Sequence, residues 1–245
     1  MKIAILGAAG RMGRMLTALA EEKGSGLEVC AKVDIAEGFD KTWDGSGAEG
    51  VVDFSFHAAV PENIGKAAAK GIPYVLGTTG LSAGEQAAVD EAARSIPVVQ
   101  SGNYSLGVNL LLALVEKAAR TLGAGYDIEV VEMHHRRKKD APSGTALMLA
   151  KAAAEGAGVD FEANAIYGRR GEPGERPAGE IAIHALRGGS VVGDHTVIFA
   201  GETERVELVH RAQDRRAFAA GALKAVQWAA GRKPGAYAMR DVLGF

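Results

Sequence analysis

The chain has 245 residues, 47% of them hydrophobic and 24% charged, with a formal net charge of −2. This length allows one large or two modest domains, and the near-neutral charge disfavours binding of nucleic acid or of a membrane surface. The apolar run after Met1 is too short for a signal peptide or a membrane span, so we expect neither. The one cysteine, Cys30, excludes an internal disulfide and a cysteine-rich metal site, which favours the cytoplasm.

The first elements predict a dinucleotide-binding unit. Residues 3–6 form an apolar run typical of a strand buried on both faces, and residues 7–13 form a glycine turn that opens a helix. Gly10 and Gly13 stand where the last two glycines of a G-x-G-x-x-G fingerprint would stand. Backbone N–H groups at such a helix start can bind a pyrophosphate. The order strand, glycine turn, helix and strand supports this prediction more strongly than the glycines alone.

The second predicted strand ends at Asp34, 21 residues after Gly13. A carboxylate at this distance is typical of the acid that binds ribose hydroxyls, although an aspartate in a turn or a helix cap is the alternative. The next residue is Ile35 rather than an arginine, and only Arg11 or Arg14 offers a cation for a 2′-phosphate. The sequence therefore favours NADH, or mixed use of NADH and NADPH, over strict use of NADPH.

Strands predicted over residues 50–54, 71–76 and 96–100 alternate with helices over 61–70 and 82–94. This alternation predicts an α/β chain with a Rossmann-like, doubly wound parallel sheet. Ligands bind such sheets at the carboxyl ends of the strands. The loops at these ends are small, polar or rich in glycine, and they comprise residues 7–13, Asp34, 77–80 and 101–104.

The second half predicts a different architecture. Alternating apolar and polar residues indicate an antiparallel meander with one covered face, which could pack on a helix layer or on another subunit. We therefore predict a dinucleotide-binding domain over residues 1–105, completed by 216–245, and a substrate-binding and oligomerisation domain over 106–215. This second domain is α+β, with a mixed or antiparallel sheet. Its expected helices cover 108–122 and 143–157, and its strands 126–133, 180–186, 190–199 and 204–212, followed by a helix over 216–230 and a tail over 235–245.

Residues 132–146 place two histidines and four cations within six positions at the end of a predicted strand. A helix start at Ser143 follows, and its free N–H groups suit a carboxylate, although simple capping is compatible with them. The alternatives are a core histidine at His134 and a solvated cationic face. A metal site is disfavoured because no cysteine and no histidine pair at helical spacing is present. The pattern favours a site for an anionic substrate that receives a proton.

This stretch resembles the signature of the 4-hydroxy-tetrahydrodipicolinate (dihydrodipicolinate) reductase family: Glu132-x-His134-His135-x-x-Lys138-x-Asp140-Ala141-Pro142-Ser143-Gly144-Thr145-Ala146. Residues 7–13, 77–80, 103–109 and 239–243 match the family too. The resemblance implies NAD(P)H-dependent reduction of (2S,4S)-4-hydroxy-2,3,4,5-tetrahydrodipicolinate to (S)-2,3,4,5-tetrahydrodipicolinate, with loss of water, in lysine and diaminopimelate biosynthesis. It also implies a homotetramer, whereas the expectations of a cytoplasmic location and of no nucleic-acid or membrane partner rest on the composition above.

The resemblance assigns roles to matching positions. His134 corresponds to the general acid, and Lys138 to a second proton donor that stabilises developing charge. Some members carry an arginine at the position of Ile35, so the cofactor preference stays open. The positions that match substrate-carboxylate contacts are His135, Ser143, Gly144 and Thr145, and those that match cofactor contacts are Gly7, Ala8, Ala9, Gly10, Arg11, Met12, Asp34, Gly77, Thr78, Thr79, Ser101, Gly102, Asn103 and Tyr104.

Two other functions compete with this prediction. A different Rossmann oxidoreductase, such as a relative of aspartate or homoserine dehydrogenase, would not need His134, His135 and Lys138 ahead of a Ser-Gly-Thr helix start. A non-catalytic NAD-binding sensor would not need an intact His134 and Lys138. The remaining cations of the run, Arg136, Arg137 and Lys139, are expected to be solvated.

Overall fold

The computed structural model describes residues 1–245 and divides into two compact units. The first unit comprises Met1–Leu106 and Arg215–Phe245, and the second comprises Gly107–Asp214. None of the helices combines the length and apolar character that crossing a bilayer requires.

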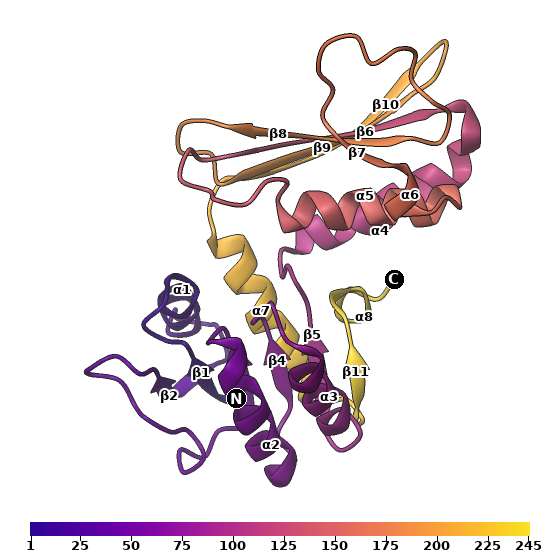
Figure 1. The fold of residues 1–245 in the computed structure, drawn as a ribbon. Coiled ribbons are helices and arrows are strands. Elements are labelled where there is room, and N and C mark those ends of the chain that lie inside the picture. Colours follow the sequence, from indigo (N-terminus) through magenta and orange to yellow (C-terminus); the bar gives the residue numbers. More distant parts are fainter. The chain divides into compact units, whose positions relative to one another are not determined.

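The first unit contains a six-stranded sheet in the order β11-β5-β4-β3-β1-β2, and every neighbouring pair is parallel (Figure 1). The chain leaves β1 toward β2 on one side and continues at β3 on the other, so the strand order reverses at β1. The crevice at such a reversal is where ligands bind in open α/β sheets. The strands are β1 (Lys2–Leu6), β2 (Glu28–Val33), β3 (Gly50–Asp53), β4 (Tyr74–Leu76), β5 (Pro97–Gln100) and β11 (Gly235–Tyr237).

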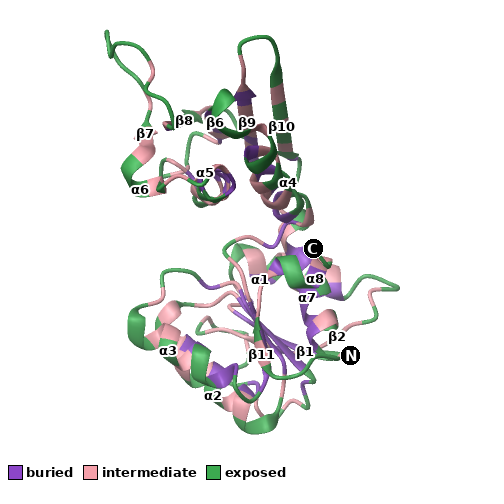
Figure 2. Ribbon diagram, turned by 90° about the vertical axis from the view of Figure 1, so that its right-hand side faces the viewer, coloured by how far each residue is buried: buried purple, intermediate pink, exposed green.

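Helices cover both faces of this sheet, and for this reason β1 is a continuous apolar run. The strands of this sheet are largely buried (Figure 2), and Ile3 and Ala4 of β1 have no exposed surface. Successive side chains of a strand point to opposite faces, so Ile3 packs in the cluster with α1 and α7, whereas Ala4 packs in the cluster with α2 and α3. The helices of this unit are α1 (Arg11–Ala20), α2 (Val60–Lys70), α3 (Ala83–Ala92), α7 (Arg216–Ala229) and α8 (Met239–Leu243).

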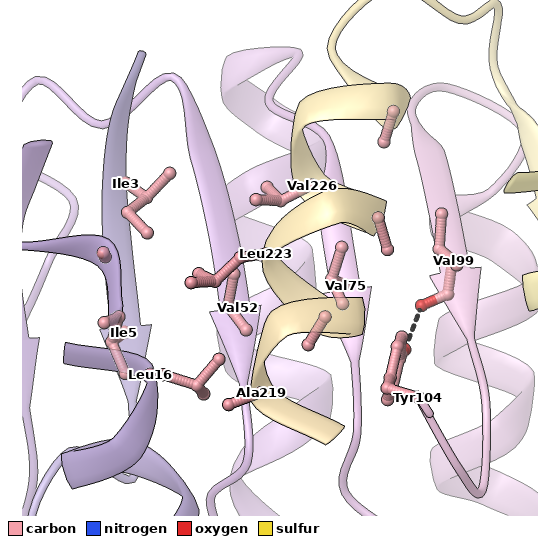
Figure 3. Close-up of a cluster of buried hydrophobic side chains, with 14 of the residues drawn as sticks. Ile3, Ile5, Leu16, Val52, Val75, Val99, Tyr104, Ala219, Leu223 and Val226 are labelled. Atoms are coloured by element: carbon pink, nitrogen blue, oxygen red, sulfur yellow. Dashed lines mark hydrogen bonds between the residues drawn. The ribbon is translucent and has the colours of Figure 1, made fainter. Parts of the chain in front are cut away.

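Helix α7 packs across β3, β4 and β5, far from them in sequence (Figure 3). Leu223 and Val226 of this helix join Val52 and Val75 of the strands in one buried cluster. The approach is closest at Gly221, where an added Cβ would lie 1.7 Å from the carbonyl oxygen of Tyr104. The helix can therefore reach this position only because residue 221 has no side chain.

The C-terminal segment differs from the tail that the sequence suggests. Gly235–Tyr237 forms β11, which pairs in parallel with β5 at the sheet edge, and Met239 of α8 is buried. A three-residue strand is too short to show a periodic pattern, so this prediction failed for lack of local signal.

The second unit contains a five-stranded mixed sheet in the order β10-β9-β6-β8-β7, with α4 and α5 on one face (Figure 1). The predicted antiparallel meander is wrong in one respect: β8 and β9 do not pair, because β6 lies between them, parallel to β8 and antiparallel to β9. Alternation reveals strands but not their neighbours. The elements are α4 (Leu106–Leu122), β6 (Asp127–His134), α5 (Gly144–Ala157), α6 (Phe161–Asn164), β7 (Ala165–Tyr167), β8 (Ile181–Arg187), β9 (Gly193–Ala200) and β10 (Arg205–Ala212).

The sheet face away from the helices carries an ion-pair network around Glu129. Its carboxylate accepts hydrogen bonds from Arg169 and Arg176 and lies 2.7 Å from Nε2 of His184. Burial opposes ionisation, but hydrogen bonds from Arg169, His184 and Arg176 outweigh it and lower the pKa of Glu129 to about 2. The network thus attaches the loop that carries both arginines to β6.

This depressed pKa predicts an acid-sensitive contribution to stability. Because the pKa of Glu129 is lower in the folded than in the unfolded chain, its contribution is complete above about pH 4.5 and is lost as the pH falls through about 2. As the pH falls through this window, the free energy of unfolding should decrease more steeply in the wild type than in Glu129→Gln. The difference in slope should reach up to roughly 1.4 kcal/mol per pH unit. Urea unfolding of both proteins between pH 6 and 3 measures the difference. Equal slopes would contradict the prediction.

Candidate active site

The glycine turn after β1 has the geometry of a phosphate cradle. Gly7 has a φ of +77°, and a Cβ there would lie 2.4 Å from the carbonyl oxygen of Phe54. A Cβ on Gly13 would lie 2.2 Å from the carbonyl oxygen of Gly7, so this glycine lets α1 pack against the turn. Gly10 caps α1 without a side-chain bond, and no acid lies in the first turn, where Arg11 and Met12 begin the helix. The N–H groups of that turn therefore suit an anion.

Asp34 lies at the end of β2, beside this turn. Its Oδ2 accepts from the N–H of Ala9 at 3.0 Å, and its Oδ1 accepts from the N–H of Ala36 at 3.0 Å. Each carboxylate oxygen keeps a further lone pair, which suits ribose hydroxyls. Asp34, Gly7 and Gly10 line one cavity of about 510 Å³.

Two cations that sequence reasoning missed also line this cavity, Lys41 and Lys66. The ammonium of Lys41 donates to the carbonyl oxygens of Asp34, Ile35 and Ala36 at 3.2, 3.0 and 2.6 Å. The loop after β2 thus brings the positive charge of Lys41 next to Asp34, where the following residue, Ile35, carries no charge. In the sequence Lys41 is one charged residue in a polar loop, and the sequence does not show that this loop folds toward Asp34.

The loops after β4 and β5 share a second cavity, of about 280 Å³. Of the expected cofactor contacts, it brings together Thr78, Thr79, Ser101 and Gly102. Gly77 is required for packing, since a Cβ there would lie 2.3 Å from the ring of Phe54.

Three side chains in these loops make structural bonds. Thr78 donates to Oδ1 of the fully buried Asp53 at 3.1 Å, and Tyr74 donates to the other oxygen. The hydroxyl of Tyr104 lies 2.8 Å from the carbonyl oxygen of Leu76. It lies 2.8 Å from that of Val99 as well (Figure 3). Asn103 accepts from the N–H of Ser105 at 2.8 Å. These contacts anchor the two loops, and Thr79 lines the cavity between them. Asp53 was missed because its only signal was a strand-end acid.

In the second unit, His134 and Ser143 meet at one buried carboxylate, Glu132. Nδ1 of His134 lies 2.6 Å from Glu132 Oε2, and the N–H of Ser143 donates to Oε1 at 2.9 Å. Arg187 donates to both oxygens, at 2.8 and 2.9 Å. Strand pairing explains this meeting, because Arg187 of β8 stands opposite His134 of β6.

Ser143 caps α5, with its Oγ accepting from the N–H of Ala146 at 3.2 Å. Nε2 of His195 lies 3.1 Å from the same oxygen, and the His134 and His195 rings meet edge to face with centroids 5.2 Å apart. Burial, together with the neighbouring His134, lowers the pKa of His195 to about 4, so this ring is neutral at pH 7. Gly144 and Thr145 form the first turn of α5, whose N–H groups suit a carboxylate.

The four cations of the run separate by burial. Lys138 is the half-buried member, and its ammonium lies 2.9 Å from Asp140 Oδ2. The exposed members are Arg136, Arg137 and Lys139, as expected for solvated cations. His135 follows the end of β6, and its N–H donates to the carbonyl oxygen of Val191 at 2.8 Å. No cluster of potential metal ligands forms anywhere in the chain.

Comparison with known proteins identifies the family. Residues 1–104 match the family model "Dihydrodipicolinate reductase, N-terminus", and residues 107–243 match "Dihydrodipicolinate reductase, C-terminus". The chain belongs to the dihydrodipicolinate reductase family. It is 48% identical to the 4-hydroxy-tetrahydrodipicolinate reductases of Rhodopseudomonas palustris (strain HaA2) and Afipia carboxidovorans, covering 100% of this chain and 97% of each relative.

Solved structures agree on the fold of this family member. A dipicolinate-bound dihydrodipicolinate reductase from Paenisporosarcina sp. TG-14 matches with a TM-score of 0.80 at 21% identity, over 98% of both chains. A probable dehydrogenase from Thermotoga maritima matches with a TM-score of 0.61 at 10% identity, over 99% of this chain and 92% of that one. The predicted family, α/β fold class and oxidoreductase function are confirmed, and this Rossmann-type family binds a nicotinamide cofactor.

Proposed function

We propose that this chain reduces 4-hydroxy-tetrahydrodipicolinate with NADH, or with both NADH and NADPH. The observation that carries the proposal is that His134 and the N–H of Ser143, at the start of α5, both contact the buried carboxylate of Glu132. This supports a proton donor beside a site for a substrate carboxylate. A cyclic imine dicarboxylate needs both groups. It needs donors for its carboxylates, and it needs a proton at its ring.

The chain's residues divide these tasks in the proposal. The first turn of α5, from Ser143 to Thr145, holds a substrate carboxylate together with His135. The 4-hydroxyl leaves as water, which yields a conjugated ring. A nicotinamide cofactor, when bound, would supply the hydride for ring C4. Lys138 stabilises the negative charge that moves toward the ring nitrogen, and His134 delivers the proton that completes the reduction.

The cofactor site in the proposal lies in the first unit. The turn at Gly7–Met12 binds the pyrophosphate, and Asp34 binds the ribose of the adenosine. The loops at Gly77–Thr79 and Ser101–Tyr104 bind the nicotinamide half. The free N–H groups at the start of α1 and the two cavities support this assignment.

Asp34 and Lys41 predict the cofactor preference. The carboxylate of Asp34 repels a 2′-phosphate, whereas Lys41 and Lys66 in the same cavity attract it, so we expect kcat/KM for NADH to equal or exceed that for NADPH. Lys41→Ala lowers kcat/KM for NADPH about tenfold and leaves that for NADH nearly unchanged, because one charge-assisted hydrogen bond is lost. Steady-state kinetics with both cofactors measure the ratio, with the exposed Lys23→Ala as control. A strong NADPH preference would contradict this cofactor assignment.

A homotetramer in the cytoplasm is part of the proposal. The sheet face of the second unit away from α4 and α5 exposes Leu186 and Val209, which are 45% and 41% accessible as residues. Strand register places both side chains on this one face. Apolar side chains on an open sheet face support packing against another copy. Cys30 is unpaired, which is consistent with a reducing compartment.

A further inference from the structure

Glu132 is a carboxylate with no exposed surface, placed in the middle of the sheet of the second unit. An apolar residue would satisfy packing at such a position more easily than a charge that needs several partners. Its two oxygens instead contact His134, Ser143 and both terminal nitrogens of Arg187. A buried charge with this many partners suggests that Glu132 has a functional role toward one of the residues that it contacts.

The charge state of Glu132 determines which nitrogen of His134 carries a hydrogen. Burial opposes ionisation, but hydrogen bonds from Arg187, His134 and Ser143 outweigh it and lower the pKa of Glu132. An ionised carboxylate can only accept. The nitrogen 2.6 Å from it, Nδ1, therefore donates, and Nε2 is left for other chemistry.

Gly193 keeps space beside that second nitrogen. This buried residue begins β9, and a Cβ added to it would lie 3.0 Å from Nε2 and 3.4 Å from Cδ2 of His134. The 3.0 Å contact with Nε2 is tighter than an ordinary van der Waals separation, so a side chain here would press on the ring edge that bears Nε2.

We propose that Glu132 is the positioning residue of His134, which holds Nδ1–H so that Nε2 delivers the proton, while Gly193 leaves room at Nε2. The inference rests on the proposed function, which makes His134 the proton donor. In the imidazolium both nitrogens carry hydrogen. Nε2 gives up its proton to the substrate, and the neutral ring keeps the hydrogen on Nδ1, bound to Glu132. Because Oε1 binds the N–H of Ser143, the same carboxylate ties the acid to the helix start that holds the substrate.

Nitrogen-15 NMR of the wild-type protein tests the tautomer without any assay. With histidine labelled at both ring nitrogens and His134 assigned by its loss in His134→Gln, the neutral ring should show hydrogen on Nδ1 and none on Nε2. The reverse tautomer overturns the inference even if the enzyme is fully active. Conversely, an inactive protein with the Nδ1–H tautomer would contradict the proposed function and leave the positioning intact.

Variants test whether this positioning matters for turnover. Glu132→Gln alone would leave the guanidinium of Arg187 without its carboxylate partner. The double variant Glu132→Gln/Arg187→Met therefore removes both charges together. We expect kcat to fall about 10²-fold and KM to change by less than about threefold. In the NMR spectrum the hydrogen of the neutral His134 ring should no longer be confined to Nδ1. The matched control is Glu129→Gln, on the opposite face of the same strand, where kcat stays within about twofold. A folded double variant with wild-type kcat and tautomer would overturn the proposal.

Gly193→Ala provides a second variant that leaves Glu132 in place. The Nδ1–H tautomer should persist in its spectrum, while kcat falls at least about tenfold because the methyl group crowds Nε2. Unchanged kcat in a folded Gly193→Ala protein would show that Nε2 is not the nitrogen that delivers the proton.

Discussion

Replacing His134 with Gln, or Lys138 with Ala, is expected to lower kcat about 10²- to 10⁴-fold while the nicotinamide cofactor still binds. A positioned general acid contributes a factor of this size. Removal of a group that stabilises developing charge costs roughly 10²- to 10³-fold. Both residues belong to the second unit, whereas the proposed cofactor contacts belong to the first. Stopped-flow or steady-state oxidation of NADH measures kcat, and fluorescence titration measures the dissociation constant of NADH.

Arg137→Ala is the matched control for Lys138→Ala. Both cations belong to the same run after β6, but Arg137 is exposed and Lys138 is half-buried beside Asp140. The kcat of Arg137→Ala should stay within about threefold of the wild-type value, because exposed cations contribute little interaction energy. Near-normal turnover in both His134→Gln and Lys138→Ala would refute the catalytic assignment.

Gly221→Ala is expected to destabilise the first unit by about 3 kcal/mol or more. The added Cβ would lie 1.7 Å from the carbonyl oxygen of Tyr104, and backbone atoms cannot rotate away as a flexible side chain can. Helix α7 would have to shift from the strands that it covers. For a chain of this size the loss corresponds to a melting temperature lower by roughly 6–12 °C.

The control for this substitution is Gly84→Ala in α3. No heavy atom lies within 4 Å of a Cβ added at Gly84, and alanine is the better helix former. Differential scanning calorimetry should show an unchanged or raised melting temperature for Gly84→Ala and a clearly lowered one for Gly221→Ala. Equal melting temperatures would contradict the packing that Figure 3 shows for α7.

Local signals made most of the fold predictable. Apolar runs separated by glycine turns indicated the parallel strands of the first unit, and Ser82 with Glu85 forms the capping box that their spacing suggests. What failed depends on pairing between distant segments. Neither the insertion of β6 between β8 and β9 nor the addition of β11 to the sheet edge follows from periodicity.

The candidate site shows the same limit. His134, Lys138 and Ser143 were predictable because one strand, one turn and one helix start carry them in sequence. Glu132 was visible in that stretch, but its role depends on Arg187, and the proximity of His195 to Ser143 likewise depends on strand register. The fold, rather than any motif, turns these residues into one network.

The most direct test follows the hydride itself. A single turnover of 4-hydroxy-tetrahydrodipicolinate with NADH that carries deuterium at both hydrogen positions of nicotinamide C4, followed by NMR of the product, locates the transferred atom. We expect one deuterium at ring C4 of tetrahydrodipicolinate for each NAD⁺ formed. Absence of cofactor oxidation, or a product without deuterium at that carbon, would contradict it.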